Sequence, residues 1–186
     1  MSSTKRQLAR ISFALLPAAL IANPSHAQTA RSLDQTCSAI ATLALPQTRI
    51  TRAEAVRVTG EYAVPGTEKG IGLAAPVKVH RSFCRVVGVV EPAINFETWM
   101  PLENWNGRFQ GFGLGAFYGK LPYTPMAQSL AKGYAVGGTD TGHQSESDDG
   151  SWAMSNGSTN QQVVEDWAHR GIHEMSVKSQ AIVESV

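Results

Sequence analysis

Two consecutive segments of strand-like composition constrain the fold of this chain more than any other feature. Residues 82–92, SFCRVVGVVEP, are rich in valine, and residues 93–101, AINFETWMP, alternate apolar with polar side chains. The Asn106-Gly107 pair that follows is the strongest short hairpin signal. We therefore expect residues 108–113 to run back along the second segment, so that the two form an antiparallel hairpin.

Helical patterns surround this hairpin. Residues 32–45 have the pattern of a short helix, and residues 124–133, TPMAQSLAKG, that of a second helix stopped by Gly133. Residues 134–143, YAVGGTDTGH, have the composition of a buried strand that breaks into a loop. Elements in this order are typical of an α/β fold, with a mostly parallel sheet that has an antiparallel edge.

The C-terminal residues 158–186 are expected to form a long helix. Ser158 and Gln161 have the spacing of a capping box at its start. Apolar side chains then recur at helical spacing, which predicts one buried stripe along the helix. These side chains are Val164, Trp167, Ala168, Ile172, Met175 and Ile182.

Two groups of polar side chains are candidate sites. Glu165, His169 and His173 stand four residues apart on the expected helix and could share a metal ion, although a polar helix face is the interpretation we favour. Asp140 and His143 follow a strand, at the place where α/β sheets tend to form sites. The favoured alternative for Asp140 is that its carboxylate caps the loop by accepting hydrogen bonds from backbone amides.

The N-terminus has the three parts of a secretory signal peptide. A basic start precedes a short apolar stretch, residues 11–22, and small residues then allow cleavage after Ala27. We expect residues 1–27 to be this signal peptide, residues 28–186 to be the mature chain, and the protein to be secreted or periplasmic. The alternative is a plain N-terminal anchor or tail.

Charge and hydrophobicity argue against a nucleic-acid-binding or membrane-spanning protein, and the cysteine content favours a disulfide. The formal net charge of +1 gives no basic field for nucleic acid, and no apolar run reaches the length of a membrane span. The chain has two cysteines, Cys37 and Cys84. In an exported protein an even number favours a disulfide, whereas the alternative is two unrelated buried thiols.

Residues 104–120, NWNGRFQGFGLGAFYGK, contain five glycines, which are costly unless the backbone must turn sharply or approach something closely. A dinucleotide fingerprint would need a helix immediately after GFGLGA, and FYGKLPY does not begin one. A tight passage between elements and an oxyanion hole, in which bare backbone N–H groups face a developing negative charge, both remain open. The oxyanion interpretation needs a nucleophile, and the sequence contains no G-x-S-x-G motif.

Several motifs in order resemble the tannase and feruloyl esterase family, from about Cys37 to the end of the chain. They are FCRV at 83–86, WNGRF at 105–109, GFGLGAFYG at 111–119, GYAVGGTDTGH at 133–143 and DWAHRGIHEMSVK at 166–178. The resemblance implies a secreted or periplasmic α/β-hydrolase that cleaves esters of aromatic acids such as gallate or ferulate. It also implies a Ser-His-Asp triad, with the serine in a Cys-Ser-x-Gly-Gly elbow.

The resemblance places these catalytic parts beyond Val186. We therefore expect an incomplete α/β-hydrolase fold, with N-terminal strands, the antiparallel hairpin and the first helices, truncated before the nucleophile elbow. No catalytic nucleophile, acid or base is expected in this chain, and no cofactor. A structural calcium is expected in a lid domain that lies outside it.

The resemblance also implies roles for residues that are present. The family loop G-x-G-N-G-G here reads Gly111 to Ala116, with Leu114 in place of asparagine. Gly113, Gly115 and Ala116 are the candidate oxyanion-hole donors, and the alanine is harmful only if φ is positive there. Cys37 and Cys84 match the family's N-terminal disulfide.

The functional expectation is a fragment of a serine carboxylic-ester hydrolase for small aromatic esters, inactive by itself. The alternative is a non-catalytic exported domain that binds a ligand or a partner.

Overall fold

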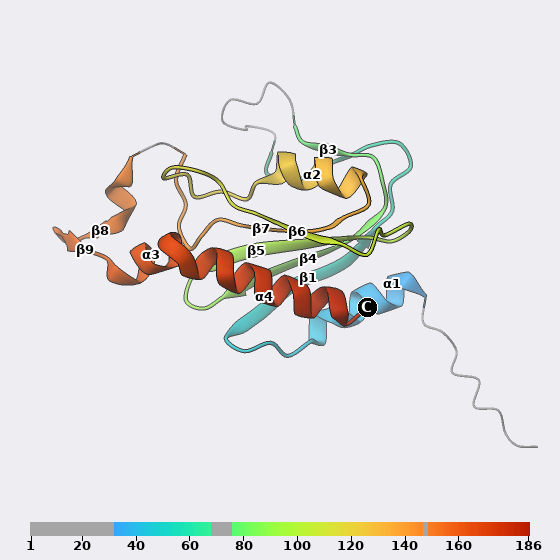
Figure 1. Ribbon diagram of the computed structural model, residues 1–186, viewed down its shortest axis with the longest axis horizontal. Coiled ribbons are helices and arrows are strands. Elements are labelled where there is room, and N and C mark those ends of the chain that lie inside the picture. The colour runs from blue at the N-terminus through green and yellow to red at the C-terminus, as the bar shows by residue number, and fades with distance from the viewer. Residues whose placement is uncertain (1–31, 68–75, 147–148) are drawn as a thin grey trace, which may run out of the picture. The chain divides into compact units, whose positions relative to one another are not determined.

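A computed structural model describes residues 32–67, 76–146 and 149–186 of the chain (Figure 1). The expected signal peptide, residues 1–27, lies outside the described residues. Five strands form the main sheet in the order β1-β4-β5-β7-β6. They are β1 (Thr48–Val56), β4 (Phe83–Val90), β5 (Ile94–Pro101), β6 (Phe109–Phe112) and β7 (Ala135–Thr139).

Helices cover both faces of this sheet, and two pairs of short strands lie outside it (Figure 1). The helices are α1 (Leu33–Ala39), η1 (Ile40–Thr42), α2 (Tyr123–Ala131), η2 (Gly150–Ala153), α3 (Gln161–Glu165), η3 (Asp166–Arg170) and α4 (Gly171–Glu184). The short pairs are β2 (Tyr62–Ala63) with β3 (Lys78–Val79), and β8 (Met154–Ser155) with β9 (Ser158–Thr159). Within the described residues, no helix is both long enough and apolar enough to cross a membrane.

The mixed α/β class is confirmed, but the predicted pairing of the glycine-rich segment is wrong. β5 pairs antiparallel with β4 on one side and with β7 on the other. β6 does not pair with β5; it pairs in parallel with β7, with Gly111 opposite Gly137. The sheet is therefore mainly antiparallel, with β6–β7 as its parallel pair, so the expectation of a mostly parallel sheet with an antiparallel edge is wrong for the described residues.

The Asn106-Gly107 signal gave the wrong pairing because a buried strand competes for the edge of β5. All five residues of β7 are buried, so inserting this strand removes more apolar surface from water than a local hairpin would. Gly107 does lie in a turn, with φ 76°. The Asn106 N–H then donates to Gly133 O at 2.9 Å, which ties this turn to the end of α2.

Two hydrophobic clusters fill the space between the helices and the sheet. On one face α1 and α4 contribute Cys37, Met175 and Ile182, which pack with Phe96 of β5. On the other face α2 contributes Met126 and Leu130, which pack with Phe83 and Trp99. The predicted disulfide between Cys37 and Cys84 is present, with a Cα–Cα distance of 5.7 Å, and joins α1 to β4.

A buried ion pair joins β4, β5 and α2. Arg85 donates to both carboxylate oxygens of Glu97, at 2.8 and 2.6 Å. Trp99 Nε1 and the Tyr123 hydroxyl donate to the same carboxylate, at 2.7 and 2.8 Å. Burial and then the charge of Glu97 raise the pKa of Tyr123, so its hydroxyl keeps the proton that it donates. The four contacts satisfy a charge that would be costly to bury alone.

The C-terminal helix is not a regular α-helix, and the first half of the apolar stripe that was predicted to be buried is partly exposed. Met175 and Ile182 are buried as expected, whereas Ile172 is 41% exposed and Ala168 is exposed. The π-helical turn η3 is the cause, because its wider repeat rotates the buried face and brings Asp166 inward. The predicted capping box is also wrong: the N-cap is Asn160, whose side chain accepts a hydrogen bond from Val163 N.

Two adjacent glycines in β7 let helices approach from both faces. A Cβ added to Gly137 would lie 2.7 Å from Met175 Sδ and from Ser179 Oγ of α4. A Cβ added to Gly138 would lie 2.5 Å from Met126 Sδ of α2. The close packing of both helices on β7 therefore depends on the absence of side chains at these two positions.

We predict that Gly137→Ala and Gly138→Ala each lower the free energy of unfolding by about 1–3 kcal/mol, because they overpack a filled interior. Urea denaturation monitored by circular dichroism measures the change. Gly115→Ala is the matched control, since no atom lies within 4 Å of an added Cβ there. Equal losses in all three variants would contradict the packing argument.

Candidate functional site

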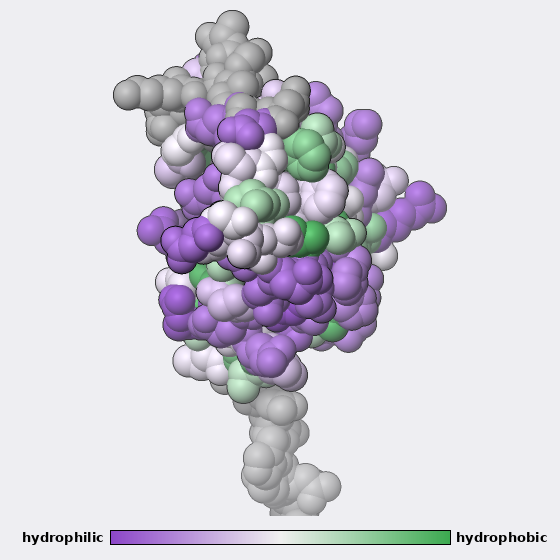
Figure 2. All heavy atoms as spheres, turned by 90° about the vertical axis from the view of Figure 1, so that its left-hand side faces the viewer, coloured by the Kyte–Doolittle hydropathy of each residue, from purple (hydrophilic) through white to green (hydrophobic). Residues whose placement is uncertain are grey.

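The glycine-rich loop, residues 113–119, leaves the sheet at the end of β6. Because β6 and β7 are parallel, their carboxyl ends meet at one edge of the sheet. The loop therefore lies beside residues 140–146, which follow β7 (Figure 1). Figure 2 shows this end of the molecule, where apolar side chains lie next to a strongly hydrophilic band. The exposed apolar side chains of the described chain include Leu114, Phe117 and Met154.

A cavity of about 900 Å³ lies between this edge and the start of α2. Loop residues Leu114, Tyr118 and Gly119 contribute to its wall. Other parts of the wall come from Asn95 and Asp140 at the sheet edge and from the first residues of α2. A volume of this size suits a small organic molecule.

The backbone N–H groups of residues 113–118 are available to a ligand. None of these six donors has a hydrogen-bond acceptor among the described residues. Their carbonyls are used differently: Trp167 Nε1 donates to Ala116 O at 3.1 Å, and His143 Nε2 lies 3.0 Å from Phe117 O. At the end of the loop, Gly119 and Ser145 exchange two backbone hydrogen bonds. The loop is thus held through its carbonyls and presents free donors.

The glycines of this loop have different local requirements. A Cβ on Gly119 would clash with the backbone carbonyl of His143, so this glycine allows two backbones to approach. A Cβ on Gly113 would meet the end of the Ile172 side chain at 2.6 Å. Gly115 has no atom within 4 Å of an added Cβ and no left-handed φ. Packing within the described chain therefore explains why position 119 is a glycine. It does not explain the glycine at position 115, which faces open space.

Ala116 occupies the conformation in which a side chain is costly. Its φ is 54°, which lies in the left-handed region that glycine adopts readily and other residues avoid. The condition under which alanine is harmful at this position, a positive φ, is therefore met. The hydrogen bond from Trp167 to Ala116 O is one contact that holds this residue in place.

Asp140 caps the turn after β7, which confirms the alternative favoured from the sequence. Its Oδ1 accepts from Gly142 N at 2.9 Å and from Asn95 N at 3.0 Å, and its Oδ2 accepts from Asn95 Nδ2 at 2.6 Å. Burial raises the pKa of this carboxyl, whereas the hydrogen bonds from Asn95 and Gly142 lower it; burial prevails. The carboxylate joins the start of β5 to the end of β7 and is occupied by these contacts.

His143 lies in an aromatic cluster against the glycine-rich loop. Its ring stacks on Trp152 at a centroid distance of 3.9 Å, and Trp152 in turn contacts Phe117 and Trp167. The Phe117 and Trp167 rings are 5.5 Å apart. Sequence reasoning missed Trp152 and the site role of Trp167, because no spacing pattern links a loop, a short helix and a π-helical turn.

The proposed metal group on the last helix is not assembled. Glu165, His169 and His173 are all exposed, and the described part of the chain holds no group of three metal-binding side chains close enough to share an ion. The π-helical turn interrupts the i, i+4 spacing on which the metal interpretation depended. These side chains belong to a polar helix face.

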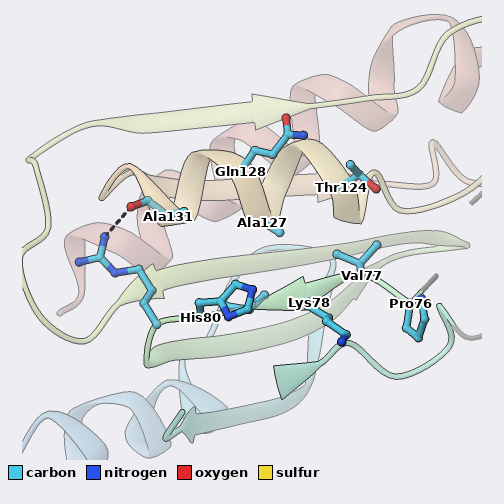
Figure 3. A pocket seen from close by; sticks show the side chains of 10 residues that line it. Pro76, Val77, Lys78, His80, Thr124, Ala127, Gln128 and Ala131 are labelled. Atoms are coloured by element: carbon cyan, nitrogen blue, oxygen red, sulfur yellow. Dashed lines mark hydrogen bonds between the residues drawn. The ribbon is translucent and has the colours of Figure 1, made fainter. Parts of the chain in front are cut away.

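A second pocket of about 720 Å³ lies between α2 and the segment around β3 (Figure 3). Two of its basic side chains, Arg81 and Lys78, are engaged in contacts that hold the fold together. Arg81 donates to Leu130 O at 3.0 Å and to Glu103 O at 2.8 Å, and Lys78 pairs with Glu61. The glycine-rich loop does not contribute to its wall. The candidate site is therefore the cavity at the sheet edge.

We predict that Asp140→Ala lowers the free energy of unfolding by about 2–3 kcal/mol, because buried amide donors lose their acceptor. Chemical denaturation measures the loss. Glu54→Ala is the control: it breaks an exposed ion pair with Arg52 and should change stability by less than about 0.5 kcal/mol. A loss at Asp140 no larger than at Glu54 would show that the cap contributes little.

Comparison with known proteins supports one family. Residues 77–186 match the sequence profile described as tannase and feruloyl esterase. The chain is 32% identical to an uncharacterized esterase of Xanthomonas campestris pv. campestris, over 84% of this chain and 26% of the relative. It is 33% identical to a probable feruloyl esterase B-2 of Aspergillus flavus, over 75% of this chain and 27% of the relative.

Solved structures agree with the sequence comparisons. The crystal structure of feruloyl esterase B from Aspergillus oryzae superposes with a TM-score of 0.69 at 25% identity, covering 83% of this chain and 30% of that one. The chain thus spans roughly a quarter to a third of the length of these relatives. On the combined evidence of the sequence profile, the relatives and the shared fold, this chain belongs to the tannase and feruloyl esterase family.

Proposed function

We propose that this chain supplies the oxyanion-stabilising part of a serine carboxylic-ester hydrolase that acts on esters of aromatic acids. Gallate, ferulate and related hydroxybenzoate esters are the proposed substrate class. Membership of an esterase family supports the reaction type. The observation that carries the proposal is the row of unpaired N–H groups in residues 113–118, beside a cavity at the edge of the sheet.

The chemistry requires donors that are fixed before the reaction. Attack on an ester carbonyl places a negative charge on its oxygen, and preorganised N–H groups stabilise that charge. Gly113, Gly115 and Ala116 remain the candidate donors. Gly115 has the clearest access, since no atom of the described chain occupies the space of a side chain there. A bare backbone at this position lets the ester oxygen come within hydrogen-bonding distance.

The attacking groups are proposed to come from polypeptide outside residues 1–186. In the complete hydrolase a serine attacks the carbonyl, a histidine transfers the proton and an aspartate orients the histidine. We place the lid domain and its structural calcium in that polypeptide as well. The proposed location is the periplasm or the exterior of the cell, in line with the signal peptide inferred at residues 1–27.

We predict that the purified chain hydrolyses methyl gallate and methyl ferulate more slowly than the complete hydrolase by a factor of about 10⁶. Oxyanion stabilisation without a nucleophile and a base leaves little catalysis. Chromatographic detection of the free acids measures the rate. Robust turnover that a serine-directed phosphonate abolishes would contradict the proposed division of the catalytic groups.

We further predict that Gly115→Leu in the complete hydrolase lowers kcat/KM at least tenfold, because the new side chain occupies the space that the ester oxygen needs. The melting temperature should stay within about 2 °C of wild type, because no described atom lies within 4 Å of a Cβ added at this position. Gly150→Ala, where an added Cβ makes an ordinary contact with Phe117, is the control. Full activity in Gly115→Leu would remove position 115 from the oxyanion site.

A further inference from the structure

The carbonyls of Ala116 and Phe117 both point to the aromatic cluster beside the loop. The Trp167 indole donates to Ala116 O at 3.1 Å. His143 Nε2 lies 3.0 Å from Phe117 O, and because a carbonyl can only accept, this nitrogen must carry the proton. Two consecutive peptide units are therefore held from the same side by two different side chains.

Holding a carbonyl also orients an amide. In a planar trans peptide the C=O and N–H bonds point in opposite directions. The unit whose carbonyl is Ala116 O carries the N–H of Phe117, and the next unit carries the N–H of Tyr118. Both N–H groups are consequently turned away from the cluster, and neither has an acceptor among the described residues. Tyr118 is itself part of the cavity wall.

The two side chains that orient these units are themselves fixed. Trp167 stands in the π-helical turn, where the fully buried Asp166 accepts from Arg170 at 2.7 Å and from Gln162 at 3.0 Å. His143 is 8% exposed and stacks on Trp152. Neither ring can move without breaking contacts inside the protein.

We propose that Trp167 and His143 are positioning residues, which aim the N–H groups of Phe117 and Tyr118 at the substrate side of the glycine-rich loop. The inference rests on the proposed function, because it treats the loop as the oxyanion-stabilising segment. It extends the donor set beyond Gly113, Gly115 and Ala116. The inference also explains the π-helical turn, because this turn determines the position of Trp167 relative to the loop.

The test replaces each donor with a phenylalanine ring that lacks an N–H group. The variants are Trp167→Phe and His143→Phe in the purified chain, with backbone ¹⁵N order parameters measured at Phe117 and Tyr118. Trp105→Phe is the matched control, because Trp105 Nε1 also donates to a backbone carbonyl, that of Arg108, at 3.0 Å in another loop. All three changes keep an aromatic ring and remove one N–H donor.

We expect order parameters of about 0.85 at both amides in the wild type and in Trp105→Phe. Trp167→Phe should lower the Phe117 value below about 0.6, and His143→Phe should do the same at Tyr118, while the amides of β5 stay rigid. A value that stays high in either variant overturns the assignment of that residue. Low values at both amides in the wild type overturn the whole inference. The Trp167→Phe test stands by itself if His143→Phe does not fold.

A kinetic measurement separates this inference from the proposed function. In the complete hydrolase, each phenylalanine variant should lower kcat for methyl ferulate about tenfold, with KM within twofold of wild type, because misaligned donors fail only in the transition state. An unchanged kcat overturns the inference although the esterase is active. A wild-type hydrolase without any esterase activity overturns the proposed function, while the order parameters still decide whether the two side chains orient the loop.

Discussion

The parallel pairing of β6 with β7 is the constraint on which the candidate site depends. It brings the carboxyl ends of two strands to one edge of the sheet, and so places the glycine-rich loop against the segment around His143. An antiparallel pairing with β5 would send the same loop elsewhere. β7 also carries two glycines on which helices pack closely from both faces. The position of the glycine-rich loop therefore depends on β7, the strand beside which β6 pairs.

Some residues of the glycine-rich loop are held in place by contacts, whereas another is accessible to a ligand. Gly119, which adjoins His143, lies where two backbones meet, and Ala116 is held in a left-handed conformation. Gly115, which directly precedes Ala116 in the chain, has no other atom within 4 Å of the place where a Cβ would lie. The loop is thus anchored through its carbonyls while its donors stay free, which is the arrangement that stabilisation of an oxyanion requires. The aromatic cluster supplies the anchors from sequence positions far from the loop.

Local composition was sufficient to predict the elements, but not their partners. The valine-rich segment forms β4 and the segment ending at Gly133 forms α2, as their patterns predict. The alternating segment forms β5, but the alternation did not predict its burial: helices cover both faces of the sheet, and Glu97 and Thr98 are buried as well as the apolar residues. The capping role of Asp140 was also accessible, since a carboxylate after a strand commonly accepts amide hydrogen bonds. The strand order could not be predicted from the Asn106-Gly107 signal, because β7, a strand distant in sequence, pairs with β5 in place of the expected hairpin partner. The π-helical turn buries Asp166 and determines the position of Trp167. It could not be predicted, because hydrophobic periodicity does not distinguish a π-helical turn from an α-helix.

The most direct measurement is a crystal structure of the complete hydrolase with a phosphonate analogue of a ferulate ester bound to its nucleophile. The phosphoryl oxygen stands for the oxyanion of the reaction. The account predicts that this oxygen lies about 2.7–3.1 Å from at least one backbone nitrogen of residues 113–118. An oxygen held entirely by other segments, with this loop too far away for any hydrogen bond, would contradict it.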